Sequence, residues 1–297
     1  MKDMNALHRC EVMNVFYTDR MIRKYEFIKE LYVRANHNWN QTFYYMLFRT
    51  MDIGPNRAAY EKLAERVEYN VILHECRRPK SVEALLLGAS GLLTIYREDE
   101  YIVELKREAY YLLRKHEIEP LRFSDWTLRG VRPQNHPILR LSQLATFFSR
   151  HDFVMNDILD CRSAQDVERL FSVESMPYWD THFIPADLSR NVPKRIGREK
   201  SHIFGINIVV PLQYAYGSYV HNDQLRACAS SLLESLDAEN NRYVREWANH
   251  GVKAANAFES QALLQISTEY CNNGRCEECF IGRRLAAIQE RGRAMKP

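Results

Sequence analysis

The sequence predicts an all-α protein, and three observations support this prediction. Apolar residues recur at intervals of three and four over most of the 297 residues, which is the spacing of one helix face. Glycine and proline number only 11 and 10, fewer than a protein built from turns and short strands needs. No strand-length run alternates apolar and polar residues between turn signals. We therefore expect an irregular multi-helix bundle with a central proline-containing loop and a C-terminal cysteine cluster.

The first half of the chain contains five predicted helices. Thr18 is an expected N-cap for the first helix, and Asn38 is one for the second. The segment 54–56 (Gly-Pro-Asn) separates the second helix from the third. Ser81 is expected to open the fourth helix, and the fifth ends near Lys115.

The second half is less regular. Residues 126–137 contain two prolines and no sustained period, which indicates a packed loop. Later helices are expected over residues 138–148, 164–171, 203–214, 223–236, 238–249 and 254–271. Residues 183–200 are polar and basic and contain two prolines, so they are the predicted linker. We expect one helical domain over residues 1–297, with a subdivision into 1–182 and 201–297 joined by this linker.

Composition and charge restrict the class of protein. A hydrophobic fraction of 46% and a charged fraction of 27% exclude a wholly disordered chain. No apolar run is long enough to span a bilayer, and no apolar signal core follows the N-terminus. The seven cysteines are odd in number and unevenly spread, unlike a secreted disulfide framework. We expect a reduced, cytoplasmic protein with no membrane partner.

The basic residues are mostly arginines. The net charge of +3 indicates no particular partner, but 30 of the 41 basic residues are arginines. Arginine presents a planar, five-donor fork that fits phosphate and carboxylate groups better than lysine does. Glu–Arg pairs on exposed helix faces also account for many of the arginines. The excess of arginine over lysine therefore indicates anion binding only where arginines cluster.

Two basic clusters are candidates for binding nucleic acid or a protein partner. The first surrounds the Pro-Gln-Asn-His-Pro loop at 133–137, where His136 is interleaved with arginines. The second lies in the predicted linker. Guanidinium groups beside planar rings hold phosphates and stack on bases. Alternatively, these side chains only support the loop by bonding to carboxylates and carbonyls. The candidate binding residues are Arg129, Arg132, His136, Arg140, Lys194, Arg195 and Arg198.

Three cysteines form a candidate metal site. Cys271, Cys276 and Cys279 have C-x4-C-x2-C spacing at a predicted helix end, and thiolates are soft metal ligands. A zinc ion is favoured over an iron–sulfur cluster, although some ferredoxins use the same spacing. A fourth ligand must come from elsewhere, with Cys228, His221 and His250 as candidates. The alternative is three reduced thiols without a metal.

The sequence contains no recognisable catalytic motif. A glycine-rich phosphate loop, a G-x-S-x-G elbow and an H-E-x-x-H pair are all missing. No acidic trio is arranged to clamp Mg²⁺ as in many nucleases. We therefore assign no catalytic residues and expect a chain that is not a self-sufficient enzyme.

Several segments, in order along the chain, carry a family resemblance. They include Asn38-Trp39, residues 83–88, residues 132–137, residues 179–182, and Tyr270-Cys271 followed by Cys276 and Cys279. They resemble the C-terminal, helical part of domain-of-unknown-function family 2851, found chiefly in Bacteroidetes. The resemblance implies that longer members begin with a PD-(D/E)XK nuclease-like domain, which this sequence lacks. It also supports a metal at the three cysteines, which recur in the family pattern.

The leading hypothesis is an accessory module of a nuclease-like family, which binds nucleic acid or a protein partner that carries the nuclease-like domain. A second hypothesis is a structural or protein-interaction scaffold whose basic groups are merely solvated. A third is an iron–sulfur or redox protein built on the cysteine cluster.

Overall fold

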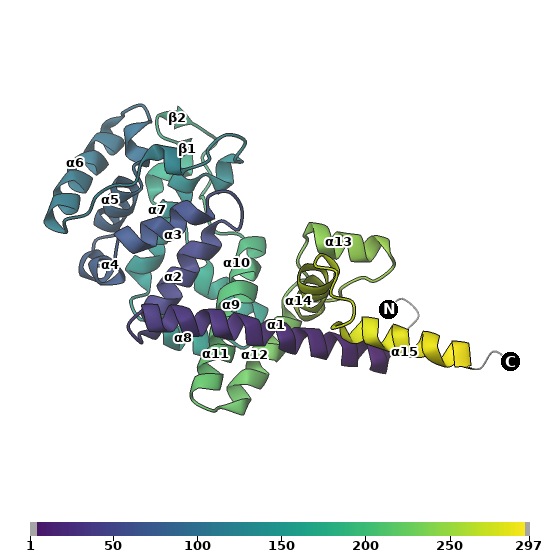
Figure 1. Cartoon of the computed structure of the whole chain (residues 1–297). Helices are drawn as coiled ribbons and strands as arrows, with labels where there is room; N and C mark the ends of the chain where they lie inside the picture. The colour runs from purple at the N-terminus through teal and green to yellow at the C-terminus, as the bar shows by residue number, and fades with distance from the viewer. Residues whose placement is uncertain (1–4, 295–297) are drawn as a thin grey trace. The chain divides into compact units, whose positions relative to one another are not determined.

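The computed structural model describes residues 5–294 and confirms the all-α prediction (Figure 1). Backbone contacts divide the chain into two compact units. The first unit comprises residues 1–30, 162–164 and 209–297, and the second comprises residues 31–161 and 165–208. The predicted linker at 183–200 therefore lies within the second unit. In the described part of the chain, no helix combines the length and the apolar character needed to cross a membrane.

The second unit is built around helix α5 (Pro79–Ala89), in which residues 81–89 are all buried. Helix α5 packs between α6 (Glu100–Lys115) and α7 (Pro137–Arg150) (Figure 1). A Cβ atom at Gly88 would lie 2.6 Å from the Cβ atom of Ala109, so the missing side chain lets α5 and α6 approach closely. The other helices are α2 (Trp39–Met51), α3 (Arg57–Arg66), α4 (Tyr69–Glu75), α8 (Val154–Asp160), α9 (Ala164–Phe171) and α10 (Arg198–Phe204).

Aromatic side chains fill the core between α2 and α7. The ring of Tyr44 lies 5.6 Å from that of Phe148, and Phe147 stacks on Phe171 at 5.6 Å. These side chains are fully buried. Truncating a buried phenylalanine typically costs about 3–5 kcal/mol, so this cluster fixes the position of α7. Helix α7 in turn carries Arg140 and Gln143, which line the pocket described below.

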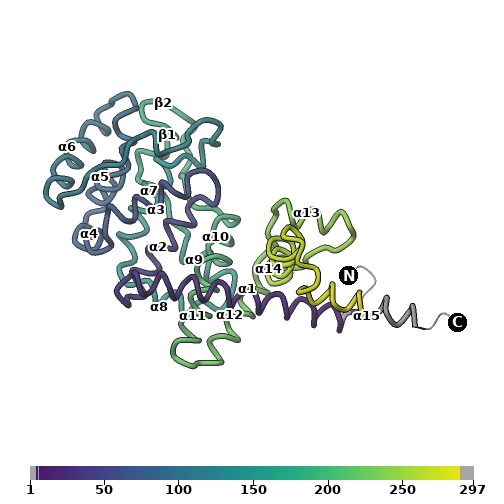
Figure 2. The backbone as a smooth tube through the Cα atoms, in the orientation of Figure 1, coloured from purple at the N-terminus to yellow at the C-terminus, as the bar shows by residue number. Residues whose placement is uncertain are grey.

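The segment predicted as a linker is folded structure. Strands β1 (His182–Ile184) and β2 (Asp187–Leu188) form an antiparallel hairpin, and Ala186 adopts a φ of +57° at its turn (Figure 2). The chain then returns along α7, where the Gln143 side chain donates to the carbonyl oxygen of Lys194 at 3.0 Å. The backbone N–H of Ser175 donates to the same oxygen at 2.9 Å. The prolines and polar residues of this segment therefore make a packed loop.

The first unit combines the N-terminal part of α1 (Ala6–Arg34) with the helices of the C-terminal third. These are α11 (Val210–Tyr219), α12 (Asp223–Ser235), α13 (Arg242–Asn249), α14 (Ala257–Gln265) and α15 (Phe280–Ala294). Helices α11 and α12 pack against each other (Figure 2). Buried polar contacts join α1 to α14, because Arg20 donates to Gln261 at 2.6 Å and Gln265 donates to Asp19 at 2.7 Å.

Helix boundaries agree with the sequence in part. Asn38 caps α2 through its side chain, as predicted. Gly251 has a φ of +83° just after α13, the left-handed conformation in which glycine commonly ends a helix. The prediction for Thr18 was wrong, because α1 begins at Ala6 and Thr18 lies on an exposed face inside this helix. The apolar periodicity alone does not show where a helix begins. Ser81 lies inside α5, which begins at Pro79, and the short helices α4 and α8 were not predicted.

Candidate functional site

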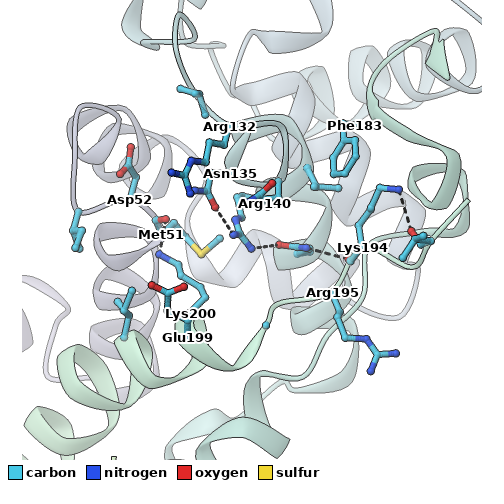
Figure 3. A pocket seen from close by; sticks show the side chains of 18 of the residues that line it. Met51, Asp52, Arg132, Asn135, Arg140, Phe183, Lys194, Arg195, Glu199 and Lys200 are labelled. Carbon is cyan, nitrogen blue, oxygen red and sulfur yellow. Dashed lines mark hydrogen bonds between the residues drawn. The ribbon is translucent and has the colours of Figure 1, made fainter. Parts of the chain in front are cut away.

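The second unit contains a cavity of about 980 Å³ whose lining is strongly basic (Figure 3). The end of α2, the loop before α7, the first turns of α7, strand β1, the segment after β2 and helix α10 all contribute to it. Two acidic side chains, Asp52 and Glu199, line this basic pocket. Seven basic side chains line it: Arg129, Arg132, Arg140, Arg190, Lys194, Arg195 and Lys200.

Arg140 is held rigidly in the basic pocket by neutral groups. Its side chain is only 7% exposed, and burial lowers the pKa of its guanidinium. The guanidinium donates to Oε1 of Gln143 at 2.8 Å and to Oδ1 of Asn135 at 2.7 Å (Figure 3). Gln143 is one turn further along α7, and Asn135 lies in the loop before the helix. An arginine stays charged in proteins, so this is a positioned positive charge bonded to two amide oxygens.

Lys200 reaches the basic pocket from α10. Its ammonium donates to the carbonyl oxygens of Thr50 and Met51, each at 2.8 Å, at the C-terminal end of α2. These carbonyls have no partner within the helix, so a cation is favourable there. Burial, together with the positive charge of Arg140, lowers the pKa of Lys200 to about 7, whereas Asp52 acts in the opposite direction.

Three arginines at the rim of the basic pocket are uncommitted. Arg129, Arg132 and Arg190 are exposed, and within residues 5–294 their guanidinium groups have no hydrogen-bond or ion-pair partner. Gly130 has a φ of +78°, a backbone conformation that favours glycine, in the turn between Arg129 and Arg132. Their forks are therefore free to bind an anion that enters the pocket.

A family model described as "Protein of unknown function (DUF2851)" matches residues 1–242. The chain belongs to this family. The matched range includes every residue of the basic pocket, whereas the cysteine motif at 271–279 lies beyond it. No curated protein and no solved structure matches the chain.

His136 lies outside the basic pocket of this DUF2851 member. It is 5% exposed, its Nδ1 accepts a hydrogen bond from the N–H of Ile138, and its Nε2 lies 2.9 Å from the Tyr96 hydroxyl. Because Nδ1 accepts, the proton is assigned to Nε2 and the ring is neutral. Burial lowers the pKa of His136 to about 4. The ring therefore caps α7 and contacts no anion in the pocket.

The basic residues of the predicted linker have mixed roles. The ammonium of Lys194 donates to three backbone carbonyls between residues 180 and 192 at 2.8–3.2 Å, and it lies 4.4 Å from the Phe183 ring centroid. Lys194 therefore closes its own loop. Arg195 lines the pocket but pairs with Glu174. Arg198 lies outside the lining and pairs with Glu168 at 3.3 Å.

Two basic residues of the pocket were absent from the predicted set. Arg190 follows the hairpin, and its place in the same pocket lining as Arg129 and Arg132 depends on a turn that the sequence did not indicate. Lys200 belonged to the basic run noticed in the predicted linker, but only the tertiary structure shows that it caps α2. The available sequence signal was the concentration of basic residues within each of two segments, 129–140 and 194–200.

The three cysteines lie in the first unit: Cys271 is the last residue of a π-helical turn at Ile266–Cys271, and Cys276 and Cys279 follow it. Cys271 and Cys276 are exposed and Cys279 is buried. A Cβ atom at Gly282 would lie 2.0 Å from the carbonyl oxygen of Cys276, so the loop packs tightly on α15. Among the described residues, no group of three His, Cys, Asp or Glu side chains is arranged to hold a metal ion. The structure gives the metal no geometric support, and the zinc or iron–sulfur site stays a prediction.

Proposed function

We propose that this chain binds single-stranded nucleic acid and holds its phosphate groups in the basic pocket. The observation that carries the proposal is the concentration of seven basic side chains against two acidic ones, in a chain whose net charge is only +3. Three of the seven have no partner within the described residues. Uncommitted arginines around a concave surface attract a polyanion and release its counterions on binding.

The lining also supplies a surface for a base. The Phe183 ring lines the pocket, and the ammonium of Lys194 covers one face of this ring (Figure 3). A nucleic-acid base stacks on an aromatic ring regardless of its identity, typically with about 1–3 kcal/mol per base. A concave pocket admits a flexible single strand, whose bases can be splayed out, better than the regular surface of a duplex.

In this proposal the chain positions a strand and does not cleave it. The lining contains two carboxylates, and the one on Asp52 accepts backbone N–H groups of Gly54 at 2.7 Å and Asn56 at 2.9 Å. Glu199 alone is left to ligate a divalent cation, and two-metal phosphodiester chemistry uses several carboxylates. We therefore expect the cleaving groups of a nuclease-like system to come from a protein partner.

The test is the binding of a fluorescein-labelled single-stranded DNA of ten nucleotides to the whole chain, measured by anisotropy at increasing salt. We expect binding at 50 mM salt that weakens as salt rises, and weaker binding by Arg132→Gln. Arg77→Gln is the matched control, because Arg77 is an exposed arginine of the same unit outside the pocket. Affinity that is independent of salt, or equal losses in both variants, contradicts the proposal.

The other two hypotheses lead to different results in the same preparation. A scaffold binds no strand at low salt and co-purifies with a protein partner. An iron–sulfur protein is coloured and contains iron when it is purified without oxygen. Either result in the absence of strand binding replaces the proposal made here.

A further inference from the structure

We propose that the deep part of the basic pocket, formed by Arg140 and Lys200, binds a terminal phosphate monoester of the strand. This inference rests on the proposed function, because the rim of the same pocket holds the rest of the strand. The terminal phosphate belongs to either the 5′ or the 3′ end, which have the same chemistry, and the experiment below distinguishes them.

The first argument is that Arg140 and Lys200 lack a matching negative charge. Both contact only neutral groups of the protein. Arg140 donates to the amide oxygens of Gln143 and Asn135. Lys200 donates to two backbone carbonyls of α2, and its ammonium lies 5.0 Å from the ring centroid of Phe204. Charges removed from water are costly unless an opposite charge compensates them. An anion that enters the pocket supplies the missing compensation.

The carboxylates of the lining do not supply it. Asp52 influences Lys200, but its two oxygens already accept hydrogen bonds from the backbone of the turn after α2. Glu199 is exposed, and within the described residues neither Arg140 nor Lys200 forms an ion pair with it. A buried cation, Arg140, and a half-buried one, Lys200, therefore line the cavity, and the nearby Asp52 carboxylate already accepts backbone hydrogen bonds.

The second argument concerns the donors that remain. An arginine has five N–H donors and a lysine has three. Hydrogen bonds to the protein use two donors of Arg140 and two of Lys200, so up to three N–H groups of Arg140 and one of Lys200 remain for a ligand. A phosphate monoester offers three terminal oxygens and about −1.5 to −2 charge at neutral pH, whereas an internal phosphodiester offers two oxygens and one charge. The monoester is the better match.

The rim residues complete the arrangement. Arg129, Arg132 and Arg190 are exposed residues of the pocket lining, whereas Arg140 is buried. Figure 3 shows Arg132 and Arg140 in this lining. A strand whose end is held by Arg140 and Lys200 would leave its internal phosphates to the rim arginines. The two sets of residues therefore contribute separately to affinity: Arg140 and Lys200 bind the terminal phosphate, and the rim arginines bind the internal phosphates.

The experiment compares three single strands of the same ten-nucleotide sequence, labelled internally: one with a 5′-phosphate, one with a 3′-phosphate and one with hydroxyls at both ends. We expect one phosphorylated strand to bind at least tenfold more tightly than the hydroxyl strand. Inorganic phosphate should compete with this preferred strand at lower concentrations than with the hydroxyl strand. The strand that is preferred identifies the end.

Variants assign the preference to residues. Lys200→Gln should reduce the preference for the phosphorylated strand to less than threefold while the hydroxyl strand still binds. Arg132→Gln should weaken all three strands by a similar factor and keep the preference. Arg140→Lys, which keeps the charge but loses the fork, should reduce the preference as well, and thermal unfolding by circular dichroism verifies that each variant is folded.

The outcomes separate the two proposals. Equal affinities of the three strands for the wild-type chain overturn the terminal-phosphate inference and leave strand binding intact. A preference that survives in folded Lys200→Gln and Arg140→Lys also overturns it. The absence of binding by any strand refutes the proposed function itself, and the inference with it.

Discussion

The rim arginines allow a quantitative prediction about salt dependence. In the triple variant Arg129→Gln, Arg132→Gln, Arg190→Gln, three uncommitted guanidinium groups are removed from the opening of the basic pocket. Each phosphate contact on a single strand contributes about 0.7 to the slope of log affinity against log salt. If each arginine neutralises one phosphate, the slope of the triple variant should be smaller in magnitude by about 2.

The loss of affinity follows from the same relation. Extrapolated from 1 M salt, one contact is worth about 8-fold in affinity at 50 mM salt and about 3-fold at 200 mM. The triple variant should therefore bind about 500-fold more weakly than the wild type at 50 mM salt, and about 30-fold more weakly at 200 mM. The difference between the two salt concentrations identifies lost phosphate contacts, because a loss of neutral contacts would be equal at both.

Folding should not confound the measurement. The three side chains are exposed and have no partner among residues 5–294, so their replacement should change the free energy of unfolding by less than about 0.5 kcal/mol. Denaturation with urea checks this directly. Fluorescence anisotropy of a labelled ten-nucleotide strand, titrated at 50, 100, 200 and 400 mM salt, provides the slopes.

A second triple variant controls for net charge. Arg77→Gln, Arg97→Gln, Arg107→Gln removes three exposed arginines of the same unit that lie outside the pocket lining. It changes the net charge of the chain by the same amount, so only its small long-range effect on affinity should remain. Equal slopes in the rim and control variants would refute the reasoning, because the phosphates would then be held by the overall charge.

Four further predictions follow from the described geometry and from the cysteine motif. His136→Ala should lower the free energy of unfolding by about 1–2 kcal/mol through the lost cap of α7, and should leave the salt slope unchanged in the anisotropy assay. Gly91→Ala should cost at least about 2 kcal/mol in urea denaturation, since its φ is +74° and a Cβ atom would lie 2.1 Å from a carbonyl oxygen, whereas Gly130→Ala, with φ +78° and open space, should cost only about 1 kcal/mol. Affinity for a terminally phosphorylated strand should fall as the pH rises above about 7. The pKa of Lys200, which faces Arg140 and Asp52, is about 7, so above this pH Lys200 must take up a proton on binding. Lys200→Met should flatten this pH dependence of the affinity. Elemental analysis should find about one zinc ion per chain and less in Cys276→Ser, and a chain purified without any metal would contradict the prediction from the cysteine motif.

Local sequence signals predicted the helices well, but not where each one starts. Asn38 was identified as an N-cap because its amide precedes an apolar repeat, and it accepts a hydrogen bond from the N–H of Gln41. Thr18 has the same chemistry, but it sits in the middle of α1, where a hydroxyl residue is tolerated on an exposed face. A capping residue is therefore informative only where the apolar stripe itself begins.

The candidate pocket was predicted only in part, because local sequence patterns show which residues are close along the chain and not which ones meet in the fold. Arg129, Arg132 and Arg140 lie close together in sequence, so the sequence alone indicates their cluster. His136 belonged to the same cluster, but a histidine directly before Pro137 at the first turn of a helix is also a capping residue, and that is its role. Lys200 comes from α10, and its hydrogen bonds to the end of α2 are tertiary contacts that no local pattern encodes.

Two buried ionisable groups of the second unit show why the pocket points to an anion. Glu83 is fully buried, and it accepts hydrogen bonds from the indole N–H of Trp179 at 2.6 Å and from the Tyr101 hydroxyl. Burial raises the pKa of Glu83, so this carboxyl can take up a proton and avoid the free-energy cost of a buried negative charge. Arg140 has no such option, because a guanidinium is not deprotonated in proteins. Its charge persists, and an anion from outside is the compensation that the open side of the pocket allows.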